Sequence, residues 1–132
     1  FTKIGKDKSC YIFSEPNKTI GNFDRKNRSK AGIFVVNTKG GVKYEVSVSA
    51  GFKFKHRTSI IFDVDGKKTN FFSNEDTAWS ESAKVDRLLV QSMRKGRKLK
   101  VTGTSSLGNK IVDIYSLSGF TKALRLIDKD CS

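Results

Sequence analysis

The clearest pattern in the chain is an alternation of apolar and polar residues over positions 42–50. Its apolar positions are Val42, Tyr44, Val46, Val48 and Ala50. A period of two is typical of a strand that has one face on the core and the other in water. The apolar run before it, 31–36, is followed by Gly40 and Gly41, which can supply the positive φ angles of a hairpin turn. The sequence therefore predicts that these two strands are paired.

Shorter apolar segments predict further strands, separated by residues that favour turns. These strands cover residues 10–13, 52–55, 60–64, 67–72, 99–103 and 111–117. The first is followed by Pro16 and an irregular basic loop, and Asp65-Gly66 predicts the turn before the strand at 67–72. In the last strand, Asp113 and Tyr115 fall on one face.

Two segments have the spacing of amphipathic helices. The apolar positions of the first, 84–95, are Val85, Leu88, Leu89 and Met93. Those of the second, 119–130, are Phe120, Ala123, Leu124 and Ile127. Gly96 stands where the first helix would place its C′ residue, and Ser118 is the predicted N-cap of the second.

These elements predict a mainly β fold in which short antiparallel strands form a sandwich or barrel, with a short helix near 84–95 and a C-terminal helix. A chain of 132 residues has the length of about one domain. We expect a single domain over 1–132, built from a basic N-terminal segment, 1–30, that includes the first strand, a β core, 31–117, and the C-terminal helix, 119–130. A parallel nucleotide-binding sheet is disfavoured.

The two cysteines, Cys10 and Cys131, lie near opposite ends of the chain, and no CxxC motif or third cysteine accompanies them. A zinc site is therefore not indicated. A disulfide between them would tie the two ends together and indicate the periplasm or secretion, because disulfides persist mainly in oxidising compartments. The alternative is a pair of buried free thiols in a cytosolic protein.

The first residue is Phe1 and not methionine, which fits removal of a signal peptide and equally a chain shortened for expression. The longest uninterrupted apolar run, 33–36, is far shorter than the ~20 residues that span a bilayer. We therefore expect an exported chain without a transmembrane segment.

Basic residues outnumber acidic residues by 26 to 13, which gives a net charge of +13. Such a charge favours anionic partners, among them lipid headgroups, acidic polysaccharides and nucleic acids. The cations concentrate in two segments, which contain Lys53, Lys55 and Arg57, and Arg94, Lys95, Arg97, Lys98 and Lys100. The simpler interpretation is a solvated surface that happens to be basic.

Phe52 and Phe54 interleave with Lys53 and Lys55. An open barrel with basic grooves and exposed aromatic rings can bind single-stranded nucleic acid. In a strand, however, these rings point away from the lysines, which favours core positions for them. A cytosolic nucleic-acid-binding barrel is therefore the alternative function, and it predicts free thiols and exposed phenylalanine rings.

No residue pattern identifies an enzyme or a metal centre. The only histidine, His56, lies between two cations and has no nearby carboxylate to orient it as a general base. Asp63 and Asp65 share a strand face, but the turn explains Asp65, and 103–108 is neither a phosphate-binding loop nor a GxSxG motif. A hydrolase would need at least two of Asp63, His56 and Ser105 in one cleft. We expect no catalytic residue, metal or cofactor.

Several segments from residue 51 onward are more specific than a generic strand or helix. They cover 51–56, 63–68, 78–79, 101–106 and, most specifically, 113–124, which contains Tyr-Ser-Leu-x-Gly-Phe-x-x-Ala-Leu. Over about residues 31–131, in this order, they resemble the invasion-associated locus B family of alphaproteobacteria.

The resemblance implies a small exported protein with an immunoglobulin-like β-sandwich and a C-terminal helix, associated in some pathogens with entry into host cells. It implies no enzymatic activity or cofactor, and Cys10 and Cys131 match the family's cysteines near the first strand and after the last helix. We therefore expect a non-enzymatic periplasmic or secreted protein that contacts anionic envelope or host components. The expected contact residues are Lys53, Lys55, Arg57, Arg94, Lys95, Arg97, Lys98 and Lys100.

Overall fold

The computed structural model describes residues 3–5, 9–41 and 43–131 and places ten strands and two helices in them. The strands are β1 (Lys3–Gly5), β2 (Ser9–Ser14), β3 (Lys18–Ile20), β4 (Gly32–Thr38), β5 (Glu45–Ser49), β6 (Ile60–Val64), β7 (Lys67–Asn74), β8 (Thr77–Trp79), β9 (Lys98–Thr104) and β10 (Lys110–Ser116). The helices are α1 (Ala83–Lys95) and α2 (Phe120–Asp130). The predicted mainly β fold with two helices is confirmed.

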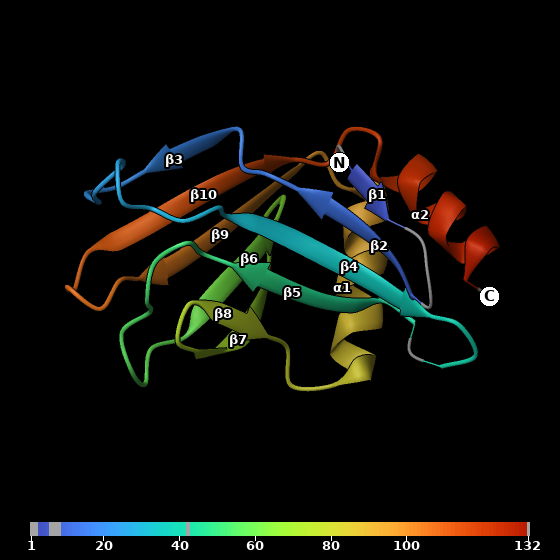
Figure 1. Cartoon of the computed structure of the whole chain (residues 1–132), viewed down its shortest axis with the longest axis horizontal. Coiled ribbons are helices and arrows are strands. Elements are labelled where there is room, and N and C mark those ends of the chain that lie inside the picture. The colour runs from blue at the N-terminus through green and yellow to red at the C-terminus, as the bar shows by residue number, and fades with distance from the viewer. Residues whose placement is uncertain (1–2, 6–8, 42, 132) are drawn as a thin grey trace.

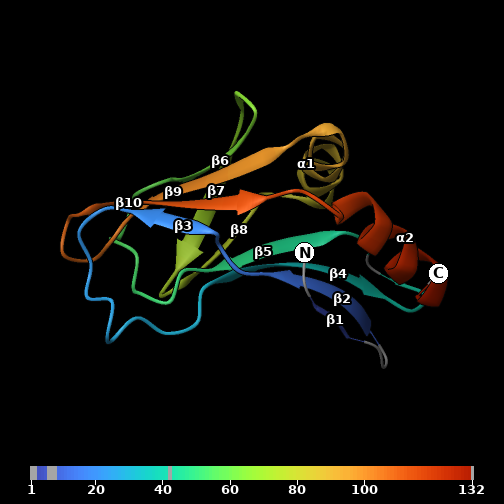
Figure 2. The same ribbon diagram turned by 90° about the horizontal axis from the view of Figure 1, so that it is seen from above.

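The strands form one antiparallel sheet, in the order β1-β2-β4-β5-β8-β7-β6-β9-β10-β3, that curls until its halves face each other (Figures 1 and 2). The first layer contains β1, β2, β4, β5 and β8, and the second contains β6, β9, β10 and β3. Strand β7 joins the layers, because its residues 72–74 pair with β8 and its residues 67–71 pair with β6. The two facing layers agree with the predicted antiparallel sandwich.

The core lies between these layers and is filled mainly by alternate residues of the longer strands, such as β4, β5, β6, β9 and β10. Val46 and Val48 of β5 face it from the first layer, and Phe62 and Phe71 stack from the second with ring centroids 3.8 Å apart. Full burial of each such side chain contributes roughly 1.5–3 kcal/mol. The period-two pattern of the sequence therefore identifies the inward faces correctly.

Both helices lie where the two layers diverge, at the right of Figure 2. Leu89 and Met93 of α1, together with Leu124 and Ile127 of α2, belong to the same buried cluster as the strands. Helix α1 begins one residue before the predicted position, and the Ser82 hydroxyl caps it by accepting a hydrogen bond from the Val85 amide at 3.2 Å. The helices therefore close the open side of the sandwich with the apolar stripes seen in the sequence.

Two predicted helix-end roles are wrong in detail. The N-cap of α2 is Gly119 and not Ser118. Gly96 follows α1, but its φ of −87° is not left-handed. A Cβ at Gly96 would lie 2.5 Å from a Val64 methyl carbon, so this glycine is required by close packing and not by a left-handed turn.

A disulfide joins Cys10 of β2 to Cys131 just after α2, as predicted. Next to it, the Asp128 carboxylate accepts hydrogen bonds from the Tyr44 hydroxyl at 2.6 Å and from the Asn37 amide nitrogen at 2.9 Å. Burial, and then the hydrogen bond to Asp128, raise the pKa of Tyr44 to about 12. One covalent bond and a polar network therefore fasten α2 to the first layer.

Some predicted strand boundaries are wrong. The strand predicted over 42–50 begins only at Glu45, because Tyr44 has a φ of 62° and its amide donates to the Asn37 side chain; Val42 lies outside the described residues. The segment 52–55 is not a strand and makes only an isolated bridge from Phe54 to Ser105. The three-residue strands β1, β3 and β8 were not predicted, since each is too short to show a period.

An ion pair holds the loop between β3 and β4 onto the second layer. An Arg28 Nη atom lies 2.6 Å from an oxygen of Asp113, and Arg28 Nε donates to the Ala50 carbonyl at 2.9 Å. The Thr19 hydroxyl donates to the same carboxylate at 2.6 Å. The side chains of Arg28 and Asp113 are only 10% and 6% exposed, so this is a buried pair whose lone pairs and donors are largely satisfied.

Asp86 of α1 is a second buried carboxylate, and it predicts a pH dependence of stability. Burial raises its pKa above the ordinary value, although hydrogen bonds from Ser80 and from the Val46 backbone act in the opposite direction. Between the ordinary aspartate pKa and the raised one, the folded protein keeps a proton that the unfolded chain has released. The stabilising contribution of Asp86 is therefore present at low pH and lost as the pH rises through the raised pKa.

We expect Asp86→Asn, which carries no titrating group, to gain stability relative to the parent as the pH rises from about 4 towards neutrality. Urea unfolding of both proteins at a series of pH values measures this difference. A difference in unfolding free energy that stays constant across the series would contradict the prediction.

Candidate functional site

Five exposed cations gather where α1 ends and β9 begins. Arg94 and Lys95 occupy the last turn of α1, Arg97 lies in the connection, and Lys98 and Lys100 lie on the outer face of β9. We call these five residues the α1–β9 cluster. None of them forms an ion pair with a carboxylate among the described residues. The cluster therefore presents to solvent five cations that form no direct ion pair with a described carboxylate.

The β6–β7 turn lies beside the cluster and holds its backbone in place. Asp65 has a φ of 49° and Gly66 a φ of 99°, which confirms the predicted Asp-Gly turn. The Asp65 carboxylate accepts hydrogen bonds from the backbone amides of Arg97 at 2.7 Å and Lys98 at 3.2 Å. Asp63 accepts one from the Gly66 amide at 2.7 Å. These carboxylates hold backbone in place and do not pair with the side-chain cations.

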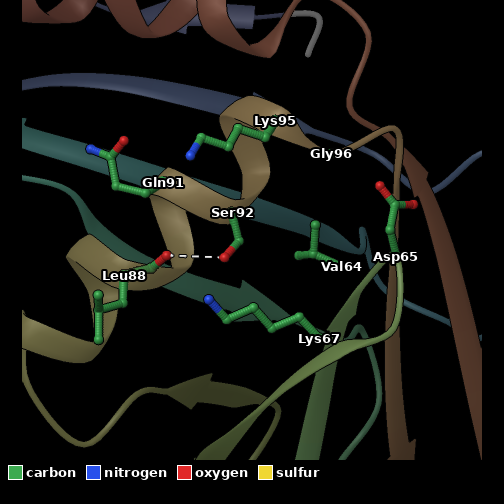
Figure 3. Close-up of a pocket in the computed structure, with 8 residues that line it drawn as sticks. All are labelled: Val64, Asp65, Lys67, Leu88, Gln91, Ser92, Lys95 and Gly96. Carbon is green, nitrogen blue, oxygen red and sulfur yellow. Dashed lines mark hydrogen bonds between the residues drawn. The ribbon is translucent and has the colours of Figure 1, made fainter.

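A hollow of about 360 Å³ lies beside the cluster, between α1 and the β6–β7 hairpin (Figure 3). Figure 3 shows Lys67 extending from β7 towards α1 beneath Ser92, with Lys95 on the last turn of the helix. Leu88, which is 56% exposed, forms the far wall. The fold therefore adds Lys67 to the basic surface, a residue that the sequence did not single out because 27 positions separate it from Arg94.

The other predicted basic segment, which contains Lys53, Lys55 and Arg57, lies away from the α1–β9 cluster. The Lys55 amide donates to the carbonyl of Thr104, at the far end of β9 from Lys98. Six residue steps separate these ends, about 20 Å along the strand. Lys53, moreover, pairs with Glu75 at 3.7 Å. The eight predicted contact residues therefore form two separate groups, and Lys53, Lys55 and Arg57 are not part of the α1–β9 cluster.

The structure also places the residues of the alternative function. Phe54 is buried at 6% exposure, and Phe52 packs against the core beside it, with ring centroids 5.5 Å apart. The cysteines are joined. The nucleic-acid-binding alternative predicted exposed rings and free thiols, and both of these structural expectations are wrong.

Asp63 lies far from Ser105, so the three candidate hydrolase residues do not form one group. Asp63 faces outward opposite Lys100, whereas Ser105 is buried beyond the other end of β9, about 16 Å further along. The Ser105 hydroxyl accepts a hydrogen bond from the Asn109 amide at 3.2 Å, and His56 is exposed. Across the described part of the chain, no group of three or more potential metal ligands is close enough to hold an ion.

Comparison with known proteins decides the family. A family model described as invasion associated locus B (IalB) protein matches residues 2–128. The chain belongs to the IalB family. The match confirms the resemblance seen in the sequence and includes the whole α1–β9 cluster. Neither a curated protein nor a solved structure matches the chain.

The residues that match the IalB family model include both layers of the sandwich and most of α2. Neither of its helices has the length and apolar character of a membrane-spanning helix within the described residues. The site that sequence and structure support best in this IalB member is therefore a charged surface on a disulfide-linked scaffold.

Proposed function

We propose that this protein is an exported, non-enzymatic binding protein that contacts anionic components of the bacterial envelope or of a host through the α1–β9 cluster. The observation that carries the proposal is the set of five exposed cations within seven residues, none paired with a described carboxylate. Uncompensated cations at a surface attract phosphate, sulfate and carboxylate groups at long range.

The negative end of the α1 dipole favours cations at the position of Arg94 and Lys95, so the cluster occupies a place where positive charge is tolerated. The disulfide supports export, because such bonds persist in oxidising compartments. Membership of an invasion-associated family supports a place at the cell envelope or the host interface.

A matched pair of charge-reversal variants tests the site. The first is Arg94→Glu/Arg97→Glu/Lys100→Glu. The control is Lys122→Glu/Arg125→Glu/Lys129→Glu, which changes three exposed cations of α2. Each reversal changes the charge by two, so both variants carry +7 where the parent carries +13.

We expect the first variant to lose about 100-fold in affinity for phosphatidylglycerol vesicles, at roughly 1 kcal/mol per lost contact, and to leave a heparin column at much lower salt. The control should remain close to the parent. Equal loss in both variants would show a response to net charge alone, and parent-like binding by the first would exclude the cluster as the contact.

A further inference from the structure

Aromatic side chains line up on the outer face of the first layer, away from the core. In the strand register Phe13 lies opposite Phe34, Phe34 opposite Ser47, Ser47 opposite Trp79, and Trp79 opposite Phe72. Residues directly opposite each other in antiparallel strands share a face of the sheet. We call Phe13, Phe34, Ser47, Trp79 and Phe72 the aromatic row.

The aromatic row is open to solvent from Phe34 to Phe72, whereas Phe13 at its other end is buried at 7% exposure. Phe72 is 59% exposed and Trp79 is 38% exposed, and Phe34 is half-buried. The core does not need the rings of Phe34, Trp79 and Phe72, because the alternate residues of the same strands, such as Val48 and Ala78, already fill it. Exposed rings that share one face of a sheet indicate an interaction site.

Hydroxyl groups lie between the two aromatic ends of the row. Ser47 separates Phe34 from Trp79, and Ser49 lies opposite Thr77 in the neighbouring register position. Tyr11, Phe13, Phe34, Lys30 and Ser49 line a hollow of about 280 Å³ at the β2–β4 end. The backbones of β4 and β8 are two strand spacings apart, roughly 10 Å, which leaves the hydroxyl groups accessible between the rings.

The shape of the aromatic row favours an extended ligand over a protein. The row crosses five strands, which is about 19 Å, and with the adjacent hydroxyl residues it is only about 7 Å wide. A stable protein interface buries roughly 800 Å² on each partner, several times the area of this strip. A second copy of the chain would therefore find too little surface here.

The charge of the aromatic row differs from that of the rest of the protein. No member of the row is charged, although the chain carries +13. At one end, Lys30 lies 3.4 Å from Glu15, so the two charges offset each other, and at the other end Arg57 lines a hollow together with Phe72. The rings and hydroxyls between these ends are uncharged, so they favour a neutral partner that differs in chemistry from that of the α1–β9 cluster.

Rings and hydroxyls in alternation match the chemistry of a sugar chain. The negative face of an aromatic ring attracts the C–H groups on the face of a pyranose, and serine and threonine hydroxyls exchange hydrogen bonds with sugar hydroxyls. Side chains on a sheet are held in place, so little entropy is lost when the ligand binds.

We propose that the aromatic row binds an extended neutral glycan, whose sugar rings stack on Phe34, Trp79 and Phe72. Ser47 and Ser49 exchange hydrogen bonds with the glycan hydroxyls between these rings, and Thr77, whose own hydroxyl donates to Asp76 at 3.1 Å, accepts a hydrogen bond from them. This site is separate from the α1–β9 cluster and does not depend on it.

Trp79 is the only tryptophan of the chain, so its fluorescence reports directly on the site. The probes are cellohexaose, laminarihexaose, maltohexaose and chitohexaose, each titrated at about 0.5 M NaCl, where screening suppresses surface electrostatics. We expect a saturable blue shift of the Trp79 emission with at least one probe. The absence of a shift with all four probes would overturn the proposal.

Variants then locate the binding. We expect Phe34→Ala and Phe72→Ala each to weaken binding roughly three- to tenfold. Phe72 is the safer variant for folding because its ring is mostly exposed. Leu88→Ala, which removes an exposed apolar side chain from α1, is the matched control and should bind as the parent does.

Two further outcomes separate this proposal from others. Binding unchanged in both phenylalanine variants would overturn it, and so would a dimer in sedimentation velocity that dissociates in Phe72→Ala, because a second copy would then occupy the row. The Arg94→Glu/Arg97→Glu/Lys100→Glu variant should still bind the glycan. The experiments therefore distinguish a failure of the proposed anion binding at the α1–β9 cluster from a failure of the proposed glycan binding at the aromatic row.

Discussion

Replacing both cysteines with serine is expected to lower the free energy of unfolding by about 4–5 kcal/mol. The disulfide joins residues 121 positions apart, so in the unfolded chain it closes a loop that includes nearly every residue. Restricting such a loop removes much of the entropy of the unfolded state, and for a loop of about 100 residues the chain-entropy model gives about 4.7 kcal/mol. The effect is large because total stabilities are only about 5–15 kcal/mol.

Guanidinium unfolding of the parent and of Cys10→Ser/Cys131→Ser, with and without reductant, measures this effect. Reductant should move the parent's unfolding midpoint close to that of the variant. It should leave the variant's midpoint unchanged, because the variant has no disulfide to reduce, so the variant controls for other effects of the reductant. A parent midpoint that does not respond to reductant would show that the bond contributes little. That result would also remove the main physical support for export.

The second large effect concerns the buried ion pair. We expect Asp113→Ala to destabilise the protein by about 3–5 kcal/mol, because it leaves the Arg28 guanidinium buried without its counter-charge. The change also removes the acceptor of the Thr19 hydroxyl, so a second polar group loses its partner. The loop between β3 and β4 should then detach from the second layer.

Urea unfolding of Asp113→Ala against two comparison variants tests this expectation. Glu15→Ala breaks the ion pair between Glu15, which is 54% exposed, and Lys30, which is 65% exposed. It should lower the free energy of unfolding by less than about 1 kcal/mol. Arg28→Met/Asp113→Leu removes both charges and should recover much of the loss. If Asp113→Ala were no more damaging than Glu15→Ala, the pair would not hold the loop.

The two proposed binding surfaces use different parts of the same scaffold. The α1–β9 cluster lies where a helix meets a strand of the second layer, and the aromatic row crosses the outer face of the first layer. Because the disulfide fixes α2 to β2 without touching either surface, the scaffold leaves both accessible. An IalB-family protein of this kind could hold an anionic partner and a neutral glycan at once.

Much of the fold is predictable from local patterns. The alternation of Val46 and Val48 with polar residues predicts an inward strand face, and the spacing of Leu89 and Met93 predicts a buried helix face; both predictions are confirmed. The Asp65-Gly66 turn was also predicted correctly, because few dipeptides adopt two consecutive positive φ angles so readily. In each case the cause acts within a few residues.

Predictions failed where distant residues decide the conformation. Tyr44 continues the alternation of its strand, yet its amide and hydroxyl bond to Asn37 and Asp128, and the backbone leaves the ladder. Phe54 alternates with lysines and is buried, but its backbone forms only an isolated bridge to Ser105 and not a strand ladder. The alternation of apolar and polar residues gives no information about where such distant bonding partners lie.

The candidate sites show the same division. Five of the cations are grouped correctly because they lie within seven residues of the sequence, whereas Lys67 joins them only through the β6–β7 hairpin. The aromatic row is not predictable from the sequence, because its rings come from four strands spread over residues 13 to 79. Each ring alone is an ordinary strand residue.

The sequence by itself therefore determined the family, the mainly β class, the two helices and the disulfide partners, since these depend on periodicity, on specific motifs and on a chain with only two cysteines. Only the tertiary structure decided that the basic residues form two groups and that exposed rings form one row. Strand register and the curl of the sheet set which distant side chains become neighbours, and both follow from the packing of the whole core.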